Sequence, residues 1–347
     1  MRLAPNFKPD RFNSNTRYQR SFESNRMKAL ICEKFAPYTE HKVKDVPAPD
    51  IKPRHVRVAV KAAGVNFPDI LQVEGNYQYK PPLPFVPGAE CSGIITELGD
   101  DVPHLKVGDR VACLAQVGAF ASEVVVDMMS VMKISDKMSF EQASAFALVY
   151  GTSYYGLKNR GNLQEGETLL VLGAAGGVGL ATVELGKAMG ANVIAAASTE
   201  EKLAVCRAYG ADHLIDYTTD NIKDAVKALG GCDVIYDPVG DKMSEPAMRT
   251  LNWGGRFLVI GFAGGEIPKI PLNLALLKSI DIRGVFWGAH TQRETKDHMS
   301  NMKDIMDMFD SGEINPRISN SYPLEDFADA FAELFNRKAM GKVVLTM

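Results

Sequence analysis

The sequence predicts an α/β protein in which a doubly wound parallel sheet is joined to a separate β-rich unit. Two observations support this. Between residues 168 and 217, apolar runs alternate with a small-residue turn and a helical pattern, which is typical of a strand–turn–helix–strand unit. From residue 27 to about 150, short apolar segments are broken often by Pro and Gly, which is typical of barrel-like β structure. The length of 347 residues leaves room for about two such units.

The strongest local signal is the turn between the apolar run Leu169–Leu172 and the helical pattern Leu180–Met189, followed by a second apolar run at Val193–Ala197. Its sequence, GAAGGVG, is a variant of GxGxxG. Glycine is needed because a pyrophosphate must approach the backbone closely, and because free N–H groups at a helix start attract negative charge. The alternative is a tight turn that binds nothing. We predict a Rossmann dinucleotide site with contacts from Gly176, Gly177, Val178 and Gly179.

The residues after the second strand indicate which dinucleotide is bound. NAD sites usually carry an acidic residue at the strand end that binds the ribose 2′-OH, but here the strand ends in Ser198. A carboxylate at that point would repel a 2′-phosphate, and its absence removes the repulsion. Ser198 can donate a hydrogen bond, Lys202 can supply positive charge, and Tyr217 ends the next predicted strand, Leu214–Tyr217. We therefore predict NADPH as the cofactor, although Lys202 can also be an ordinary solvated helix residue.

Composition excludes several other classes of protein. The net charge of −3 gives no reason to expect nucleic acid as the main partner, and no apolar run approaches the roughly 18 residues of a membrane-spanning helix. The cysteines are odd in number, scattered and free of CxxC spacing, which argues for reduced thiols in a reducing compartment such as the cytoplasm and against a cluster of thiolate zinc ligands. They are Cys32, Cys91, Cys113, Cys206 and Cys232.

Residues 1–26 differ from the rest of the chain. They hold six basic residues against two acidic ones, are rich in Asn and Ser, and lack any hydrophobic periodicity. This composition predicts a disordered basic leader. It is either a flexible tail ahead of a natural beginning near Met27 or, because it is rich in Arg and poor in acids, a mitochondrial transit peptide.

The remaining patterns divide the chain further. We predict a β-rich domain over residues 27–150, a dinucleotide-binding domain over 151–288, and a return to the first domain over 289–347. The pattern becomes helical from Phe140. Further predicted strands are Val56–Lys61, Phe120–Asp127, Asp233–Asp237, Arg256–Gly261 and Lys342–Thr346, and further predicted helices are Thr295–Asp310 and Leu324–Phe335.

Several motifs occur together in one order along the chain. They are AAGVNFPDILQVEGNY at 62–77, PFVPGAECSGII at 84–95, VGDRVA at 107–112, GTSYYGL at 151–157, the glycine turn, GADHLIDY at 210–217, DPVGD at 237–241, GRFLVIGFAGG at 255–265 and GKVVL at 341–345. Together they resemble the medium-chain dehydrogenase/reductase superfamily, and within it the zinc-free quinone oxidoreductase (zeta-crystallin-like) branch, over about residues 27–347. The resemblance implies a GroES-like domain, a Rossmann domain, a cofactor cleft between them and a subunit that usually forms a homodimer.

The same alignment of motifs argues against a metal. Zinc-dependent relatives carry a catalytic Cys, a His within GHE and a later Cys, because zinc prefers thiolate and imidazole donors. In this chain Asn66 and Ala89 stand at the first two positions, and Val149–Tyr150 lies near the third. We therefore expect no catalytic and no structural zinc.

The resemblance also implies roles for individual residues. Asn66 and Asp69 would lie near the nicotinamide, with Asn66 holding the nicotinamide, its ribose or the substrate oxygen. Some relatives carry a Tyr two residues after the Asp, where this chain has Leu71, so Tyr77, Tyr79 and Tyr150 become the available proton donors. We assign catalytic roles to Asn66, Asp69 and Tyr150. Cofactor contacts are further expected from Thr152, Phe262, Ala263, Phe286, Trp287 and Lys342.

These expectations lead to three hypotheses about function. The first is an NADPH-dependent, zinc-independent reductase that transfers a hydride to a quinone, because a hydroquinone anion is already well stabilised and needs no strong general acid. The second is a reductase of an α,β-unsaturated carbonyl substrate, such as an enone, a 2-alkenal or an enoyl thioester, which requires a proton at the α-carbon. The third is an NADPH-binding protein with a structural or RNA-binding role, for which the basic leader is the only support.

Overall fold

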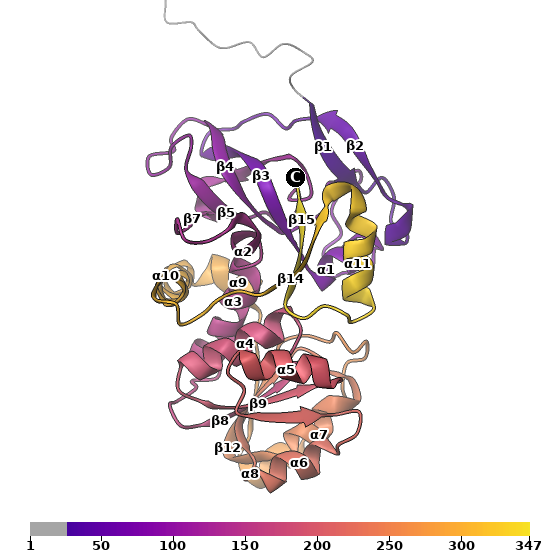
Figure 1. Ribbon diagram of the computed structural model, residues 1–347, viewed down its shortest axis with the longest axis vertical. Coiled ribbons are helices and arrows are strands. Elements are labelled where there is room, and N and C mark those ends of the chain that lie inside the picture. Colours follow the sequence, from indigo (N-terminus) through magenta and orange to yellow (C-terminus); the bar gives the residue numbers. More distant parts are fainter. Residues whose placement is uncertain (1–25) are drawn as a thin grey trace, which may run out of the picture.

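The computed structural model describes residues 26–347. The predicted basic leader lies outside these residues, except for Arg26, which begins the first strand. Figure 1 shows two β structures, a β-rich part around β3 and β4 and an α/β part around β8 and β9, with α2, α3, α9 and α10 between them. The predicted fold class, a GroES-like domain combined with a Rossmann sheet, is confirmed.

The β-rich domain is built on a largely antiparallel sheet with the order β14-β15-β3-β4-β5-β7, and β6 also pairs with β3. A two-stranded antiparallel sheet, β1-β2, lies beside it and is joined to it by a bridge between Ala29 and Ala121. The strands are β1 Arg26–Ile31, β2 Lys42–Pro47, β3 His55–Val65, β4 Glu90–Leu98, β5 Arg110–Leu114, β6 Glu123–Asp127, β7 Val131–Lys133, β14 Ile318–Pro323 and β15 Lys342–Thr346.

The second sheet is parallel throughout, with the order β10-β9-β8-β11-β12-β13, which is the doubly wound order of a Rossmann fold. Alternate residues of one strand pack on opposite faces: Leu169 and Val171 belong to one hydrophobic cluster, and Leu170 and Leu172 to another. This explains why the strands are continuous apolar runs in the sequence. The strands are β8 Thr168–Leu172, β9 Asn192–Ala197, β10 His213–Asp216, β11 Cys232–Asp237, β12 Leu251–Val259 and β13 Asp281–Gly284.

Helices cover both faces of the parallel sheet. Residues of α3, α4 and α10 share a hydrophobic cluster with one face, whereas residues of α6, α7 and α8 pack on the other. In the β-rich domain, α11 packs against β14 and β15 (Figure 1). The α-helices are α1 Phe67–Val73, α2 Phe140–Ser144, α3 Ala147–Tyr154, α4 Gly177–Ala188, α5 Glu200–Ala208, α6 Ile222–Ala228, α7 Ser244–Met248, α8 Asn273–Lys278, α9 Trp287–Arg293, α10 Thr295–Ser311 and α11 Phe327–Phe335.

Most predicted elements are confirmed, but some boundaries are wrong. Strand β12 begins at Leu251 rather than Arg256. The prediction missed its first residues because Gly254, with φ of +72°, and Gly255 interrupt the apolar pattern, and the pairing with β11 is irregular at this end. The predicted strand Phe120–Asp127 is shorter, since β6 begins at Glu123. The last strand, β15, pairs antiparallel with β3, which confirms that the chain returns to the β-rich domain. All five cysteines are buried and unpaired, as expected for reduced thiols.

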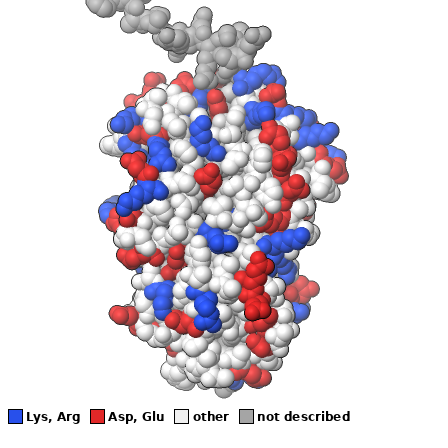
Figure 2. Space-filling view, viewed as in Figure 1, with Lys and Arg blue, Asp and Glu red and all other residues white. Residues whose placement is uncertain are grey.

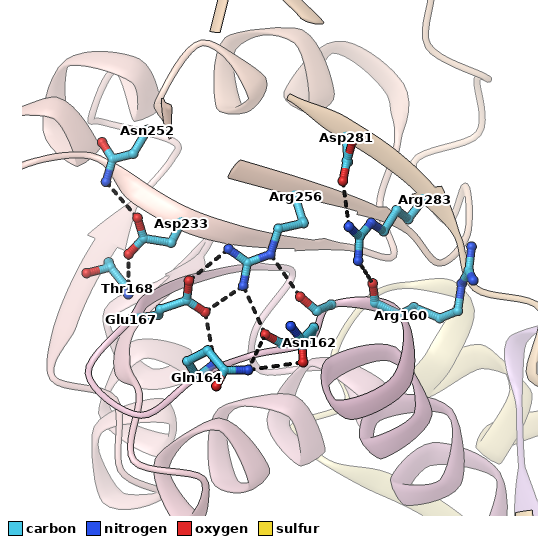
Figure 3. Close-up of polar contacts among 11 residues, drawn as sticks. Arg160, Asn162, Gln164, Glu167, Thr168, Asp233, Asn252, Arg256, Asp281 and Arg283 are labelled. Atoms are coloured by element: carbon cyan, nitrogen blue, oxygen red, sulfur yellow. Dashed lines mark hydrogen bonds and ion pairs between the residues drawn. The ribbon is translucent and has the colours of Figure 1, made fainter. Parts of the chain in front are cut away.

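A polar network closes the amino-terminal edge of the parallel sheet (Figure 3). The guanidinium of Arg256 donates to both carboxylate oxygens of Glu167, at 2.8 and 2.5 Å, and to the carbonyl of Gly161 at 2.8 Å. Asp233 accepts the Thr168 N–H at 2.8 Å and the Asn252 amide at 3.0 Å. These contacts hold the segment before β8 to β11 and β12. In open α/β sheets, ligands bind at the carboxyl ends of the strands, and this network occupies the opposite edge.

The network predicts a stability effect without a catalytic one. Replacing Arg256 with methionine leaves Glu167 without its charged partner and should lower the free energy of unfolding by about 2–3 kcal/mol, as expected for hydrogen bonds between charged groups. Arg283→Met is the matched control, because Arg283 and its partner Asp281 are more exposed, and it should lower stability by less than about 1 kcal/mol. Urea unfolding of both variants measures the difference, and equal losses would contradict the prediction.

Candidate active site

The glycine turn connects β8 to α4, and its glycines are needed for different reasons. Gly173 has φ of +59°, a conformation that favours glycine. A Cβ on Gly179 would lie 2.3 Å from the carbonyl oxygen of Gly173, so this glycine allows the turn to pack against the helix. At Gly176 the nearest atom to an added Cβ is 3.5 Å away, and Gly176, Gly177 and Val178 are only half-buried. The free N–H groups at the start of α4 are therefore accessible to an anion.

The residues predicted to recognise a 2′-phosphate gather at the carboxyl end of β9. Lys202 donates from its ammonium to Ser198 Oγ at 3.2 Å and to the backbone carbonyl of Arg337 at 2.7 Å. Tyr217 follows β10 and donates its N–H to the carbonyl of Ala197, at the end of β9. Burial, and next the positive charge of Arg337, lowers the pKa of Lys202. The charge of Arg337 thus acts on the Lys202 ammonium, although the direct contact between the two residues is through the Arg337 carbonyl, and an anion bound here would stabilise both cations.

A second polar cluster lies where β3, β4 and β15 meet. The ammonium of Lys342 donates to Asn66 Oδ1 at 2.6 Å, to Glu90 Oε1 at 2.9 Å and to the carbonyl of Val65 at 3.1 Å. The Asn66 amide nitrogen donates to Glu90 Oε1 at 3.0 Å and to the carbonyl of Gly64 at 3.3 Å. Glu90 Oε2 accepts the N–H of Leu148 at 3.1 Å. The structure therefore brings the predicted Asn66 and Lys342 together around Glu90, which the sequence alone did not single out.

Asp69 lies at the start of α1, beside this cluster. Its carboxylate accepts the backbone N–H of Asn66 at 2.8 Å. Burial raises the pKa of Asp69 to about 7, and the charge of Glu90 adds to this, although the Asn66 N–H and the charge of Lys342 oppose it. Burial, and next the charge of Asp69, raises the pKa of the half-buried Tyr77. The Asp69 carboxyl group, which can hold a proton near neutral pH, therefore lies beside Asn66. Its charge acts on the Tyr77 hydroxyl.

Tyr150 lies in a different environment from the other predicted catalytic residues. Its hydroxyl donates to Glu184 Oε2 at 2.5 Å, its ring stacks on Phe146 with centroids 5.0 Å apart, and the side chain is buried. Burial, and next the charge of Glu184, raises the pKa of Tyr150 well above its ordinary value. Glu184 belongs to α4 and also accepts the N–H of Asn315 at 2.6 Å. These contacts favour a structural role for Tyr150, and its catalytic role stays a prediction without a supporting contact.

The remaining predicted cofactor contacts differ in accessibility. Thr152 is half-buried in α3. Phe262 and Phe286 are exposed, with Ala263 beside Phe262 and its carbonyl 3.4 Å from the Arg337 guanidinium. Trp287 is buried against Gly151, where an added Cβ would lie 2.6 Å from the indole ring. Packing of Trp287 against α3 therefore explains that residue without a cofactor.

Comparison with known proteins shows the family of this chain. Residues 52–136 match the alcohol dehydrogenase GroES-like domain, and residues 177–304 match the zinc-binding dehydrogenase family. A quinone oxidoreductase-like protein 2 homolog of Nematostella vectensis is 44% identical over 84% of this chain and 81% of its own length. The chain belongs to the quinone oxidoreductase-like proteins of the medium-chain dehydrogenase/reductase superfamily.

Two solved structures of quinone oxidoreductases have the same fold as this family member. The Escherichia coli quinone oxidoreductase complexed with NADPH superposes with a TM-score of 0.86 at 26% identity, over 92% of this chain and 100% of that one. The quinone oxidoreductase of Thermus thermophilus has a TM-score of 0.81 at 31% identity, with the same coverage. This chain, with its glycine turn and polar cluster, thus has the fold of an oxidoreductase family.

Two observations on the described residues bear on whether this quinone oxidoreductase-like chain could hold a metal. Within residues 26–347, no three His, Cys, Asp or Glu side chains are grouped as a metal ion would require. The positions expected for zinc ligands hold Asn66 and Ala89, and the Lys342 ammonium, itself a cation, contacts Asn66 and Glu90. In the same part of the chain, no helix is long and apolar enough to cross a membrane.

Two site residues of this family member were not predicted from the sequence. Arg337 lies far from Lys202 in sequence and has φ of +57°, so its approach depends on the turn after α11. Glu90 follows Ala89 in the segment PFVPGAECSGII, but nothing in its local sequence indicates that its partner is Lys342. The signal for this pair would have been an acidic residue and a lysine that are each predicted to be buried in a strand, because such residues are rarely buried unless they are paired.

Proposed function

We propose that this protein is an NADPH-dependent, zinc-independent reductase that transfers a hydride to a quinone. The observation that carries the proposal is the Lys202 ammonium, held by Ser198 Oγ and the Arg337 carbonyl at a strand end that lacks the acid typical of NAD sites. The NADPH complex of the Escherichia coli relative supports this choice of cofactor. When bound, the cofactor supplies a hydride, and with one proton from solvent it reduces a quinone to a hydroquinone.

A quinone suits the donors that this site has to offer. All three protons of the Lys342 ammonium and both amide protons of Asn66 are used within the cluster, and the Tyr150 hydroxyl is held by Glu184. Asn66 Oδ1 accepts from Lys342 and also faces the Asp69 N–H in the capping box of α1, which holds the amide in one place beside the proposed site of the nicotinamide ribose or carboxamide. A substrate that needs no strong general acid fits such a site best.

One observation favours a second candidate, a reductase of enones, 2-alkenals or enoyl thioesters. Protonated Asp69, whose burial raises its pKa to about 7, can serve as a proton source beside Asn66, whose backbone N–H it accepts at 2.8 Å. An α,β-unsaturated carbonyl requires such a donor because hydride addition to its β-carbon leaves an enolate.

The test is oxidation of NADPH, followed by its absorbance, with an ortho-quinone and an enone offered in parallel and with EDTA added to half of the samples. We expect fast turnover of the quinone and no effect of EDTA. Turnover of the enone alone would support the second candidate. Loss of activity in EDTA that zinc restores would contradict zinc independence, and inactivity with both substrates would contradict both candidate functions.

We further propose that the protein forms a homodimer through the free edge of its parallel sheet. Among residues 26–347, strand β13 has one neighbour, β12, and the nearby helix α8 exposes Leu276 by 80%, with Leu272 before it exposed by 75%. Such an apolar surface beside an unpaired strand is suited to pairing with a second copy of the chain. Sedimentation analysis tests the dimer.

On the face drawn in Figure 2, basic and acidic side chains are interspersed, which fits a small-molecule substrate better than a nucleic acid.

The compartment that we propose is the cytoplasm. The five buried, unpaired cysteines fit a reducing compartment. The basic leader leaves the mitochondrion as the alternative, and intact-mass measurement of the native protein distinguishes a retained leader from a removed one.

A further inference from the structure

Lys342 enters the site from the end of the chain and lies across the glycine turn. Gly341 forms a β-bridge with Gly176 and donates its N–H to the carbonyl of Ala175 at 2.9 Å. A Cβ on Gly177 would lie 3.0 Å from Lys342 Cδ. The absence of a side chain at Gly177 therefore gives the aliphatic part of Lys342 room to pass from β15 toward Asn66. This is a second reason for glycine at 177, independent of any phosphate.

The ammonium of Lys342 determines how the Asn66 amide is oriented. Because an ammonium can only donate, the amide oxygen must face Lys342, at 2.6 Å. The amide nitrogen must then face Glu90 and Gly64, as observed. Without the ammonium, Glu90 and the Gly64 carbonyl still require the amide nitrogen on their side, but the amide oxygen loses the donor that holds it in place. The position of the oxygen that Asn66 offers to a cofactor therefore depends on Lys342.

Lys342 also balances a charge that would otherwise be isolated. The Glu90 side chain is 1% exposed and the Lys342 side chain 6% exposed, and their charged atoms are 2.9 Å apart. Removing one partner of such a pair leaves an uncompensated buried charge, which destabilises the fold strongly. A single substitution would therefore mix a loss of stability with any loss of orientation, and the two effects need a charge-balanced variant to be separated.

We propose that Lys342 is a positioning residue, which fixes the Asn66 amide for the nicotinamide end of the cofactor and does not itself bind the cofactor phosphates. This rests on the proposed NADPH-dependent function. It assigns to the buried Lys342–Glu90–Asn66 cluster the role of orienting the nicotinamide, while the Lys202–Arg337 pair holds the other end of the cofactor. The two ends can therefore be weakened separately by substitution.

The test compares Lys342→Met with the double variant Lys342→Met/Glu90→Gln, in which no buried charge is left alone. The single variant should melt at a lower temperature, and the double variant should recover most of that loss. Both should bind NADPH within about threefold of the native affinity, because the phosphate contacts are unchanged. In the double variant we expect kcat to fall at least tenfold with little change in the KM for quinone, and the increase in NADPH fluorescence on binding to be reduced.

Two further variants complete the design. Lys338→Met removes an exposed lysine from the same carboxyl-terminal segment and should change none of these measurements. Lys342→Arg keeps the charge and the donors and should restore part of kcat. Native kcat and native fluorescence in the double variant would overturn the proposal, as would a loss of NADPH affinity greater than tenfold, which would make Lys342 a direct phosphate ligand. The fluorescence and affinity measurements need no turnover, so an inactive native protein would contradict the proposed function while still testing the role of Lys342.

Discussion

Replacing Lys202 with alanine should raise the KM for NADPH about tenfold and leave the KM for NADH nearly unchanged. A charge-assisted hydrogen bond to a phosphate contributes on the order of 1.5–3 kcal/mol, which corresponds to a factor of ten or more in binding. NADH lacks the 2′-phosphate and so loses nothing when the ammonium is removed. The native ammonium is held at 2.7 Å from the Arg337 carbonyl and 3.2 Å from Ser198 Oγ, already close to the phosphate position that we propose.

Arg337→Ala should also raise the KM for NADPH, and the double variant should depart from the product of the two single effects, because residues that bind one phosphate share a partner. Lys338→Ala is the control, because it removes an adjacent exposed charge and should have little effect. Steady-state kinetics with both cofactors measures the cofactor preference directly. An equal loss with NADPH and NADH would show that Lys202 and Arg337 stabilise the fold or the adenosine, and would rule out 2′-phosphate recognition.

The sequence predicts the parts of this site that depend on local structure. The glycine turn could be located because a buried strand must be followed by a tight turn and a helix for the motif to occur, and β8 and α4 lie as expected. Ser198 and Lys202 could be named because they directly follow β9. Strand β15 was predicted correctly from Lys342 to Thr346, and so was its pairing with the β-rich domain.

The contacts between distant segments could not be predicted in the same way. Arg337 reaches Lys202 through the turn after α11, and Glu184 reaches Tyr150 because α3 and α4 pack side by side. Tyr150 was therefore proposed as a proton donor from its place near a motif, while its hydroxyl is held by a carboxylate. Residue type and spacing identify groups that are able to react, but only packing decides which of them are already hydrogen-bonded.

The Asp69→Asn variant should reduce kcat/KM for an enone by about a hundredfold or more at pH 6, within the range typical of general acids. In the native enzyme, kcat/KM should be highest below pH 7 and fall about tenfold per pH unit above it, because burial raises the pKa of Asp69 to about 7 and the neutral acid is the donor. The quinone reaction should change less than about threefold, since its product anion needs no strong acid. Asp101→Asn, at an exposed loop position, is the control.

The Asp69 carboxyl group should also make the free energy of unfolding decrease as pH rises. An unfolded aspartate titrates near its ordinary pKa of 3.8, whereas burial raises the folded pKa to about 7. Between these values the folded state holds the proton that the unfolded state has lost, so the free energy of unfolding decreases as pH rises through this window and stays low above it. The full difference is on the order of 4 kcal/mol, and Asp69→Asn removes it because asparagine does not titrate and its oxygen still accepts the Asn66 N–H.

Urea unfolding at pH 5 and pH 8 measures this effect. The free energy of unfolding of the variant, relative to that of the native protein, should be higher at pH 8 than at pH 5. A variant that loses ground there would mean that ionised Asp69 is stabilised by the Asn66 N–H and Lys342 more than burial opposes it, and the neutral-acid role would fail with it.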